Sequence, residues 1–497
     1  MPVRRIRIPR RLLRAVRRLP RGVTRLSSCL RAASGFAISL LVHTALLVVL
    51  GLLLVWQEMQ GSHGVTVLPF VEDIAPEPFV EELCIQAIPL PADVSGTAAR
   101  APAETQLPDA PHIPAPSPDL LAGPGLPEPA AGSRRSMSDD LLAATDVPSG
   151  GFEGRTASAR ARLVGQRGGT PASEDAVARG LAWLAAHQRP DGSWRFDHRD
   201  SVCGGLCRDP GIVGSTTAAT SLALLPFLGA GEIGEGCQYQ RVVADGLYYL
   251  CSRLLITPQG GDLQEGTMYA QGIAAIALCE AYAMSRDESL RVPAQLAIDF
   301  ICRAQHEAGG WRYFPGQPGD TTVLGWQLMA LKSARLARLD VSPEVFTRVG
   351  KFLDGVQREE GAVYGYQKPD KAAVPTAVGL LGRMYLGWPR EDSRLARGAG
   401  YLERLGPSRT DMYFNYYATQ VLHHYEGSGW DAWNAILRDR LIATQSRRGH
   451  EHGSWYFHDE HGKSGGRLYT TAMCVMILEV YYRHMPLYGR RAVQEDL

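Results

Sequence analysis

Apolar positions recur at helical spacing over the C-terminal two thirds of the chain. From about residue 173 onward, apolar residues at steps of three and four alternate with polar connectors. Residues 268–279 and 470–480 are apolar on nearly every side, which is typical of a helix buried between two layers. The pattern therefore predicts an all-α domain over residues 173–488, in which surface helices pack against buried ones.

Residues 179–194 indicate how each surface helix is expected to end. Leu181 and Leu184 share one helix face, and residues 190–192 (Pro-Asp-Gly) form a turn in which Pro fixes φ and Gly accepts positive φ. Gln188 ends the helix and Trp194 follows the turn. We expect the Gln188 amide to bond free backbone groups at the helix end, with the Trp194 indole shielding those bonds from water.

This helix end recurs along the domain. It is marked by an aromatic-aliphatic pair in the first five copies, and the steps between copies are 39 to 66 residues. The copies lie at 183–184, 249–250, 300–301, 352–353, 401–402 and, in degraded form, 440–441. The later Gln and Trp positions are Gln305 with Trp311, Gln357 (followed by tyrosines instead of Trp), and Gln445 with Trp455. Such internal repeats indicate stacked helix pairs that cannot bury their apolar faces alone.

The repeated pattern resembles the QW motif of the squalene cyclase and prenyltransferase superfamily. Residues 179–194 match every motif position, and residues 297–311 lack only the leading basic residue. The resemblance covers about residues 175–488. It implies an α/α toroid of six helical hairpins, with inner and outer rings around a central cavity. The inner helices are then expected to begin near residues 216, 267, 320, 374, 411 and 468.

In such a toroid, the starts of the inner helices face one mouth of the cavity. Among the residues placed there, the expected cavity-binding residues are Tyr269, Gln271, Thr321, Trp326, Gln327, Tyr413, Asn415, Tyr416 and Tyr469. A partly polar cavity lined by aromatic residues suits an apolar ligand. The alternative is that these aromatic residues simply fill the centre of the ring.

Candidate acids are Asp320 and Asp411. Residues 317–322 occupy the place of the Asp-x-Asp-Asp-Thr-Ala motif with which class II cyclases protonate an alkene, but Gln317 and Gly319 replace its first two acids. Alkene protonation needs a carboxylic acid that is kept protonated, and a lone Asp at a helix start is often an N-cap instead. The Asp-x-Cys element that protein prenyltransferases use to bind zinc is absent, so the sequence leaves open whether the chain is an enzyme.

Cysteine and histidine residues gather in the first and last connectors. Cys203 and Cys207 lie in the first, and His450 and His452 in the last. Ring closure would make these connectors neighbours, and such ligands suit zinc. Because the spacings match no zinc template, we expect no cofactor; a disulfide between the two cysteines or a polar surface loop is the alternative.

The N-terminal segment predicts a membrane anchor. Residues 1–35 contain eleven arginines and no acid, and Phe36 begins a twenty-residue apolar run that would span about 30 Å. We therefore predict a basic cytoplasmic arm (1–34) and one transmembrane helix (35–56), which place the rest outside the inner membrane. Nucleic-acid binding and a transit peptide are alternative readings of the arginines, but the apolar run favours the bilayer as partner and no nucleic acid.

Residues 57–172 differ in composition from both neighbours. Sixteen of the 32 prolines fall between residues 68 and 171, among alanine, glycine and acidic residues. Such a segment cannot bury enough apolar surface to offset its ordering entropy, so it predicts a disordered linker. Residues 489–497 form a tail.

Two functions follow from these observations. The first is a membrane-anchored extracytoplasmic binding or scaffold module for an apolar or polymeric ligand or an envelope protein. The second is an enzyme that acts on an isoprenoid-like or other apolar substrate.

Overall fold

A computed structural model describes residues 151–200 and 202–488. The chain divides into two units, residues 1–76 and 77–497, and every described residue belongs to the second. The predicted arm, transmembrane helix, tail and linker up to residue 150 lie outside the described residues. None of the helices within the described ranges is both long and apolar enough to cross a membrane.

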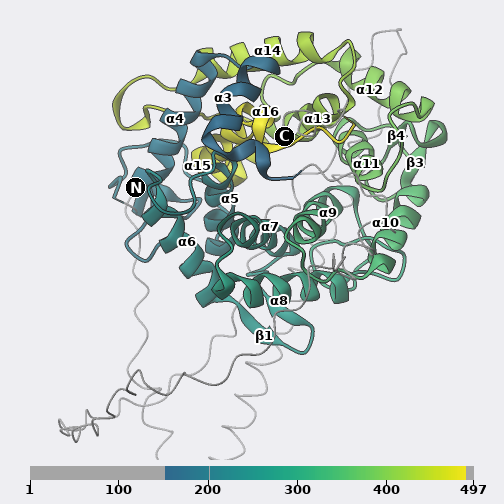
Figure 1. Cartoon of the computed structure of the whole chain (residues 1–497), viewed down its shortest axis with the longest axis horizontal. Coiled ribbons are helices and arrows are strands. Elements are labelled where there is room, and N and C mark those ends of the chain that lie inside the picture. The colour runs from purple at the N-terminus through teal and green to yellow at the C-terminus, as the bar shows by residue number, and fades with distance from the viewer. Residues whose placement is uncertain (1–150, 201, 489–497) are drawn as a thin grey trace, which may run out of the picture. The chain divides into compact units, whose positions relative to one another are not determined.

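Six helices form a closed inner ring, because each contacts the next and the last contacts the first (Figure 1). They are α5 (Thr216–Gly229), α7 (Met268–Ser285), α9 (Thr321–Leu336), α11 (Ala373–Tyr385), α13 (Met412–Tyr425) and α15 (Glu460–Leu478). Helix α7 buries nearly every side chain, as an element enclosed on all sides must.

Six further helices surround this ring. They are α4 (Pro171–Ala186), α6 (Gln240–Arg253), α8 (Glu288–Ala304), α10 (Pro343–Val356), α12 (Ser393–Leu405) and α14 (Trp430–Thr444). Each precedes an inner helix, and α10 and α12 bury only one face. The predicted all-α toroid of six hairpins is therefore confirmed over the described residues.

One predicted boundary is wrong. The helical unit begins before residue 173, with η3 (Glu153–Arg155) and α3 (Ala157–Gln166). Helix α3 lies within the predicted linker, and only Leu163 and Val164 of its ten residues are buried. The last inner helix bends at Gly466, where φ is 63°, and its long straight part begins after this kink, close to the predicted start near residue 468; a short helical stretch from Glu460 precedes the kink.

A buried ion cluster lies at the C-terminal ends of α5 and α7. Arg155 Nη1 lies 2.7 Å from a carboxylate oxygen of Glu280 on α7, and Arg483 Nη2 lies 3.2 Å from the same oxygen. Arg483 belongs to the short helix α16 (Val480–Arg483) and also donates to the carbonyl of Leu225 on α5. This cluster joins the first and last described helices to the same end of the inner ring.

Short elements fill the connectors. Strands β1 (Leu255–Thr257) and β2 (Gly260–Asp262) pair antiparallel with Ile256 opposite Gly261, and β3 (Gln357–Arg358) pairs likewise with β4 (Val363–Tyr364). The 3-10 turns are η4 (His198–Asp200), η5 (Glu359–Gly361) and η6 (Gly449–Glu451).

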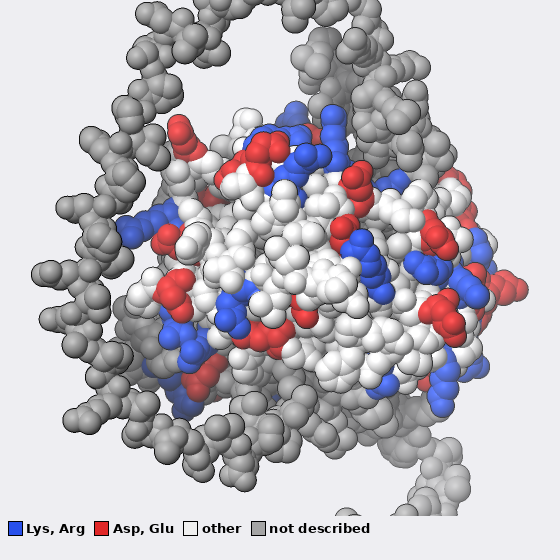
Figure 2. All heavy atoms as spheres, turned by 90° about the horizontal axis from the view of Figure 1, so that it is seen from below, with Lys and Arg blue, Asp and Glu red and all other residues white. Residues whose placement is uncertain are grey.

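Figure 2 shows that acidic and basic side chains border a largely uncharged area on one outer face of the molecule.

Candidate functional site

The glutamine and tryptophan of the first repeat join two outer helices. Gln188 Nε2 donates to the carbonyls of Gly192 at 3.0 Å and Val242 on α6 at 2.9 Å. The buried indole of Trp194 donates to the carbonyl of Leu184 at 2.8 Å, at the end of α4. The Leu184 carbonyl is one of the groups that a helix C-terminal end leaves free, so here the indole forms the bond at the helix end, whereas the Gln188 amide ties the turn to the neighbouring outer helix.

Two further repeats show the same arrangement. Gln305 donates to Gly309 at 2.9 Å and to Val345 of α10 at 3.1 Å, and the Trp311 indole donates to a carbonyl of α8 at 2.8 Å. Gln445 donates to Gly453 at 2.9 Å and to α4 at 2.8 Å, while the Trp455 indole bonds α14 at 2.8 Å. Because Gln445 reaches from the last outer helix to the first, this third pair also closes the outer ring.

The second and fourth repeats depart from this pattern. In the second, Gln271 of α7 supplies the amide, donating to Gly261 and to Ala297 of α8, both at 3.0 Å. Gln271 is therefore part of the ring wall, and its prediction as a cavity residue is wrong. After Gln357, Tyr364 occupies the place of the indole, and its backbone N–H donates to Thr376.

A central cavity opens among the N-terminal parts of the inner helices. Its walls come from α5, α7, α9, α13 and α15 and from the first connector, and four predicted residues line it: Tyr269, Trp326, Tyr413 and Tyr469. The volume of the cavity is about 70 Å³. Sequence reasoning missed His461, which also lines the cavity and stacks on Tyr413 at 5.3 Å between ring centres.

The other predicted cavity residues support the wall instead of lining it. Thr321 donates to the carbonyl of Gly365 at 2.6 Å, and Gln327 donates to that of Met268 at 2.7 Å. The Asn415 side chain accepts from the backbone N–H of Ser408 and donates to the carbonyl of the same residue, in the connector before α13. Tyr416 stacks on Trp326. The assignments of Thr321, Gln327 and Asn415 to the cavity are wrong because these buried polar side chains satisfy neighbouring backbone groups instead. The assignment of Tyr416 is wrong because its ring packs on Trp326 and does not line the cavity.

Asp320 is the N-cap of α9. One carboxylate oxygen accepts from the backbone N–H groups of Thr322 at 3.0 Å and Val323 at 2.8 Å, and from the Thr322 hydroxyl at 2.6 Å. That hydroxyl lies 3.0 Å from the hydroxyl of Tyr269, which lines the cavity. Burial raises the pKa of Asp320 to about 6. The carboxyl is thus one hydroxyl removed from the cavity wall.

Asp411 is the N-cap of α13. Its carboxylate accepts from the backbone N–H of Phe414 at 2.8 Å. It does not line the cavity described above.

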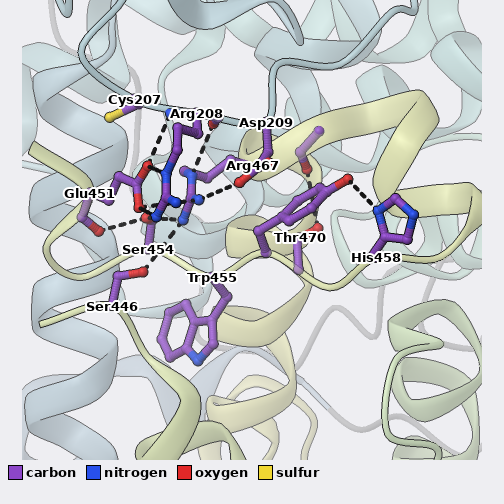
Figure 3. Close-up of polar contacts among 12 residues, drawn as sticks. Cys207, Arg208, Asp209, Ser446, Glu451, Ser454, Trp455, His458, Arg467 and Thr470 are labelled. Carbon is purple, nitrogen blue, oxygen red and sulfur yellow. Dashed lines mark hydrogen bonds and ion pairs between the residues drawn. The ribbon is translucent and has the colours of Figure 1, made fainter.

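Ion pairs join the first and last connectors beside the N-terminal part of α15 (Figure 3). The buried Arg467 lies 2.6 Å from Asp209 and 3.3 Å from Glu451, and donates to the hydroxyl of Ser454 at 3.1 Å. Arg208 pairs with Glu451 at 2.9 Å. We call this junction of the first and last repeats the seam.

Four potential metal ligands meet beside the seam. The ligand atoms of His187, Cys203, Cys207 and His450 all lie within 4.8 Å of one another. His452 is exposed and is not in this group, so its place among the predicted candidates is wrong. Sequence reasoning missed His187 because it occupies a position at which the motif allows any residue. Its nearness to two cysteines in the same connector is the signal that could have found it.

Several solved structures resemble this chain. An inactive variant of an alpha-1,6-mannanase of Salegentibacter sp. in complex with alpha-1,6-mannotetrose has a TM-score of 0.46 and 11% identity, covering 63% of this chain and 99% of its own. The type II terpene cyclase MstE from Scytonema has a TM-score of 0.43 and 13% identity, covering 62% and 97%. A GH76 alpha-mannanase of Bacteroides thetaiotaomicron has a TM-score of 0.45 and 11% identity, covering 65% and 97%.

No protein-family model and no curated protein matches the chain. At the identities and TM-scores above, the solved structures give no ground for assigning a function, and the toroid is established by its own helix contacts.

Proposed function

We propose that this chain is a membrane-anchored extracytoplasmic binding protein whose central cavity holds one apolar chain, such as an acyl or isoprenyl segment. The observation that carries the proposal is the aromatic cavity at the ring centre. Water in such a cavity would find few of the two to four polar partners that it needs, so an apolar occupant is favoured.

The orientation of the tyrosines supports this choice of ligand. Tyr269 and Tyr413 direct their hydroxyls to Thr322, at 3.0 and 3.1 Å, and so offer ring surface to the cavity. Within the described part of the chain, the buried hydroxyl of Tyr469 has no hydrogen-bond partner. An unpaired buried hydroxyl is costly, and a polar group at the end of an apolar ligand would satisfy it.

The membrane part of the proposal rests on the sequence. The twenty-residue apolar run that begins at Phe36 and the arginine-rich segment before it are the features expected of a single anchor with its N-terminus in the cytoplasm. A linker after it would keep the ring within reach of the lipid from which an apolar ligand could come. Alkaline phosphatase fused after Gln60 should be active if this orientation is right, and inactive if the chain continues in the cytoplasm.

Binding can be tested with the full chain in detergent and the fluorescent fatty acid cis-parinaric acid as probe. Ala218 lines the cavity, so Ala218→Leu should fill part of it and weaken binding by about tenfold or more. The matched control is Ala396→Leu, on the exposed side of α12. Equal affinities in the two variants, or no saturable binding by the natural protein, would contradict the proposal.

A second candidate function is proton transfer to an unsaturated apolar substrate. It is favoured by the chain of hydrogen bonds from Asp320 through Thr322 to Tyr269. Asp320→Asn keeps an oxygen for capping α9 but removes the acid. It should abolish turnover of a polyprenyl substrate if this function is right, and leave cis-parinaric acid binding unchanged if the residue is only a cap.

A further inference from the structure

We propose that His187, Cys203, Cys207 and His450 bind one zinc ion that fastens the first repeat of the ring to the last. Cys207 Sγ lies 3.4 Å from both His187 Nε2 and His450 Nδ1. In a tetrahedral site with Zn–S of about 2.3 Å and Zn–N of about 2.0–2.1 Å, sulfur and nitrogen ligands are roughly 3.5 Å apart. Both sulfur–nitrogen distances at Cys207 match this spacing, and all four ligand atoms lie within 4.8 Å of one another.

The surroundings of His187 select the nitrogen that would face the metal. Its Nδ1 lies 2.6 Å from the carbonyl of Trp183, so Nδ1 carries the proton and donates it. The lone pair is then on Nε2, the atom directed at Cys207. The Trp183 ring stacks on the imidazole at 3.9 Å between ring centres and fixes its orientation. A histidine oriented by a carbonyl on its far nitrogen is usual for metal ligands.

The two cysteines suit the same ion. Both are buried, and the backbone N–H of Cys207 donates to Cys203 Sγ at 3.2 Å. Two thiolates and two neutral imidazoles around Zn²⁺ carry no net charge, so the ion adds no uncompensated charge to a largely buried place. Four protein ligands leave no open position, which is typical of a structural zinc site.

The positions of the ligands in the fold indicate what the ion does. His187 follows α4, the cysteines lie in the connector to α5, and His450 lies on η6 before α15. No chain segment joins the last hairpin directly to the first, so this boundary depends on side chains and on backbone contacts. A zinc ion there would close a loop from residue 207 to residue 450, beside the ion pairs of Arg467.

The first test is the metal content of the full chain, purified in detergent without chelator and measured by elemental mass spectrometry. We expect one zinc per chain, and a cobalt-substituted form with the visible bands of a tetrahedral thiolate site. His450 is exposed, so His450→Ala should fold while binding zinc about tenfold more weakly or worse. His452→Ala, two residues away, is the matched control and should keep the ion.

The cysteines provide a second, independent test. Cys203→Ser with Cys207→Ser should remove the zinc, whereas Cys251→Ser on α6 should not. Chelation should lower the melting temperature of the natural protein and leave that of the double variant unchanged. A disulfide between Cys203 and Cys207 in the purified protein, a natural protein without zinc, or full zinc retention by His450→Ala would each overturn the proposal.

Discussion

Arg467 offers the most direct test of how the ring is held closed. Its side chain is 3% exposed and lies 2.6 Å from Asp209. Removing one partner of a buried ion pair costs about 3–5 kcal/mol. Asp209 is 31% exposed and Glu451 keeps Arg208, so water and the remaining pair relieve part of that cost. We therefore expect Arg467→Met to destabilise the ring by roughly 3 kcal/mol, the low end of the range.

The loss should also be local. The backbone N–H of Ile212 donates to the carbonyl of Ser464 at 2.9 Å, and that of Arg467 donates to Asp209 at 2.8 Å. In Arg467→Met these amides should exchange faster, as followed by hydrogen-exchange mass spectrometry, while those around Gln305 keep their protection. The matched control is Arg447→Met, which changes an exposed arginine of the last connector. A denaturation midpoint equal to the control's, or an even loss of protection around the ring, would refute this reasoning.

Three further predictions concern other parts of the ring. Trp311→Phe leaves a buried carbonyl of α8 unpaired and should lower the free energy of unfolding by about 1–3 kcal/mol or more. Urea denaturation measures this loss, with Trp430→Phe as the control variant. Gly466→Ala forces a side chain into a backbone region that only glycine adopts easily and against Gly211, so we expect a loss of about 3 kcal/mol or more in the same assay. The raised pKa of Asp320, about 6, means that the folded state binds a proton more tightly than the unfolded one. The stability that protonation of Asp320 provides is fully present below about pH 4 and is lost as the pH rises through 6. Acidification from pH 7 to 5 should therefore raise the melting temperature more for the natural protein than for Asp320→Asn.

The sequence was sufficient to predict the ring because its signal is local and repeated. Gln305 and Trp311 lie six residues apart, as do Gln188 and Trp194, and this recurring spacing marks the end of an outer helix. Helix α3 gave no such signal, because its sequence has no apolar period and the structure buries only two of its residues. It is held by residues more than 300 positions away, which pack on it from α16.

The cavity residues were harder to predict than the ring. Position at the start of an inner helix was the criterion, and it served for Tyr269 and Trp326, whose large rings must occupy the centre. It failed for Gln271 and Thr321, because a polar side chain at the same height can turn into the wall and bond a backbone group there. Whether such a side chain turns into the wall or into the cavity depends on which carbonyl the neighbouring repeat presents. The spacing of residues within one repeat gives no information about that carbonyl.

A closed ring of six hairpins has five boundaries that the chain itself crosses and one that it does not. Local opening should begin at this sixth boundary, since no covalent link opposes it. Several of the interactions described above lie at this boundary: the Arg467 ion pairs, the amide of Gln445 on α4 and the cluster around Cys207. Arg483, after the last hairpin, also bonds Leu225 of α5 in the first. If a ligand enters the cavity by an opening of the ring at this boundary, these groups control that opening. A zinc ion at Cys207 would then set the rate of ligand entry.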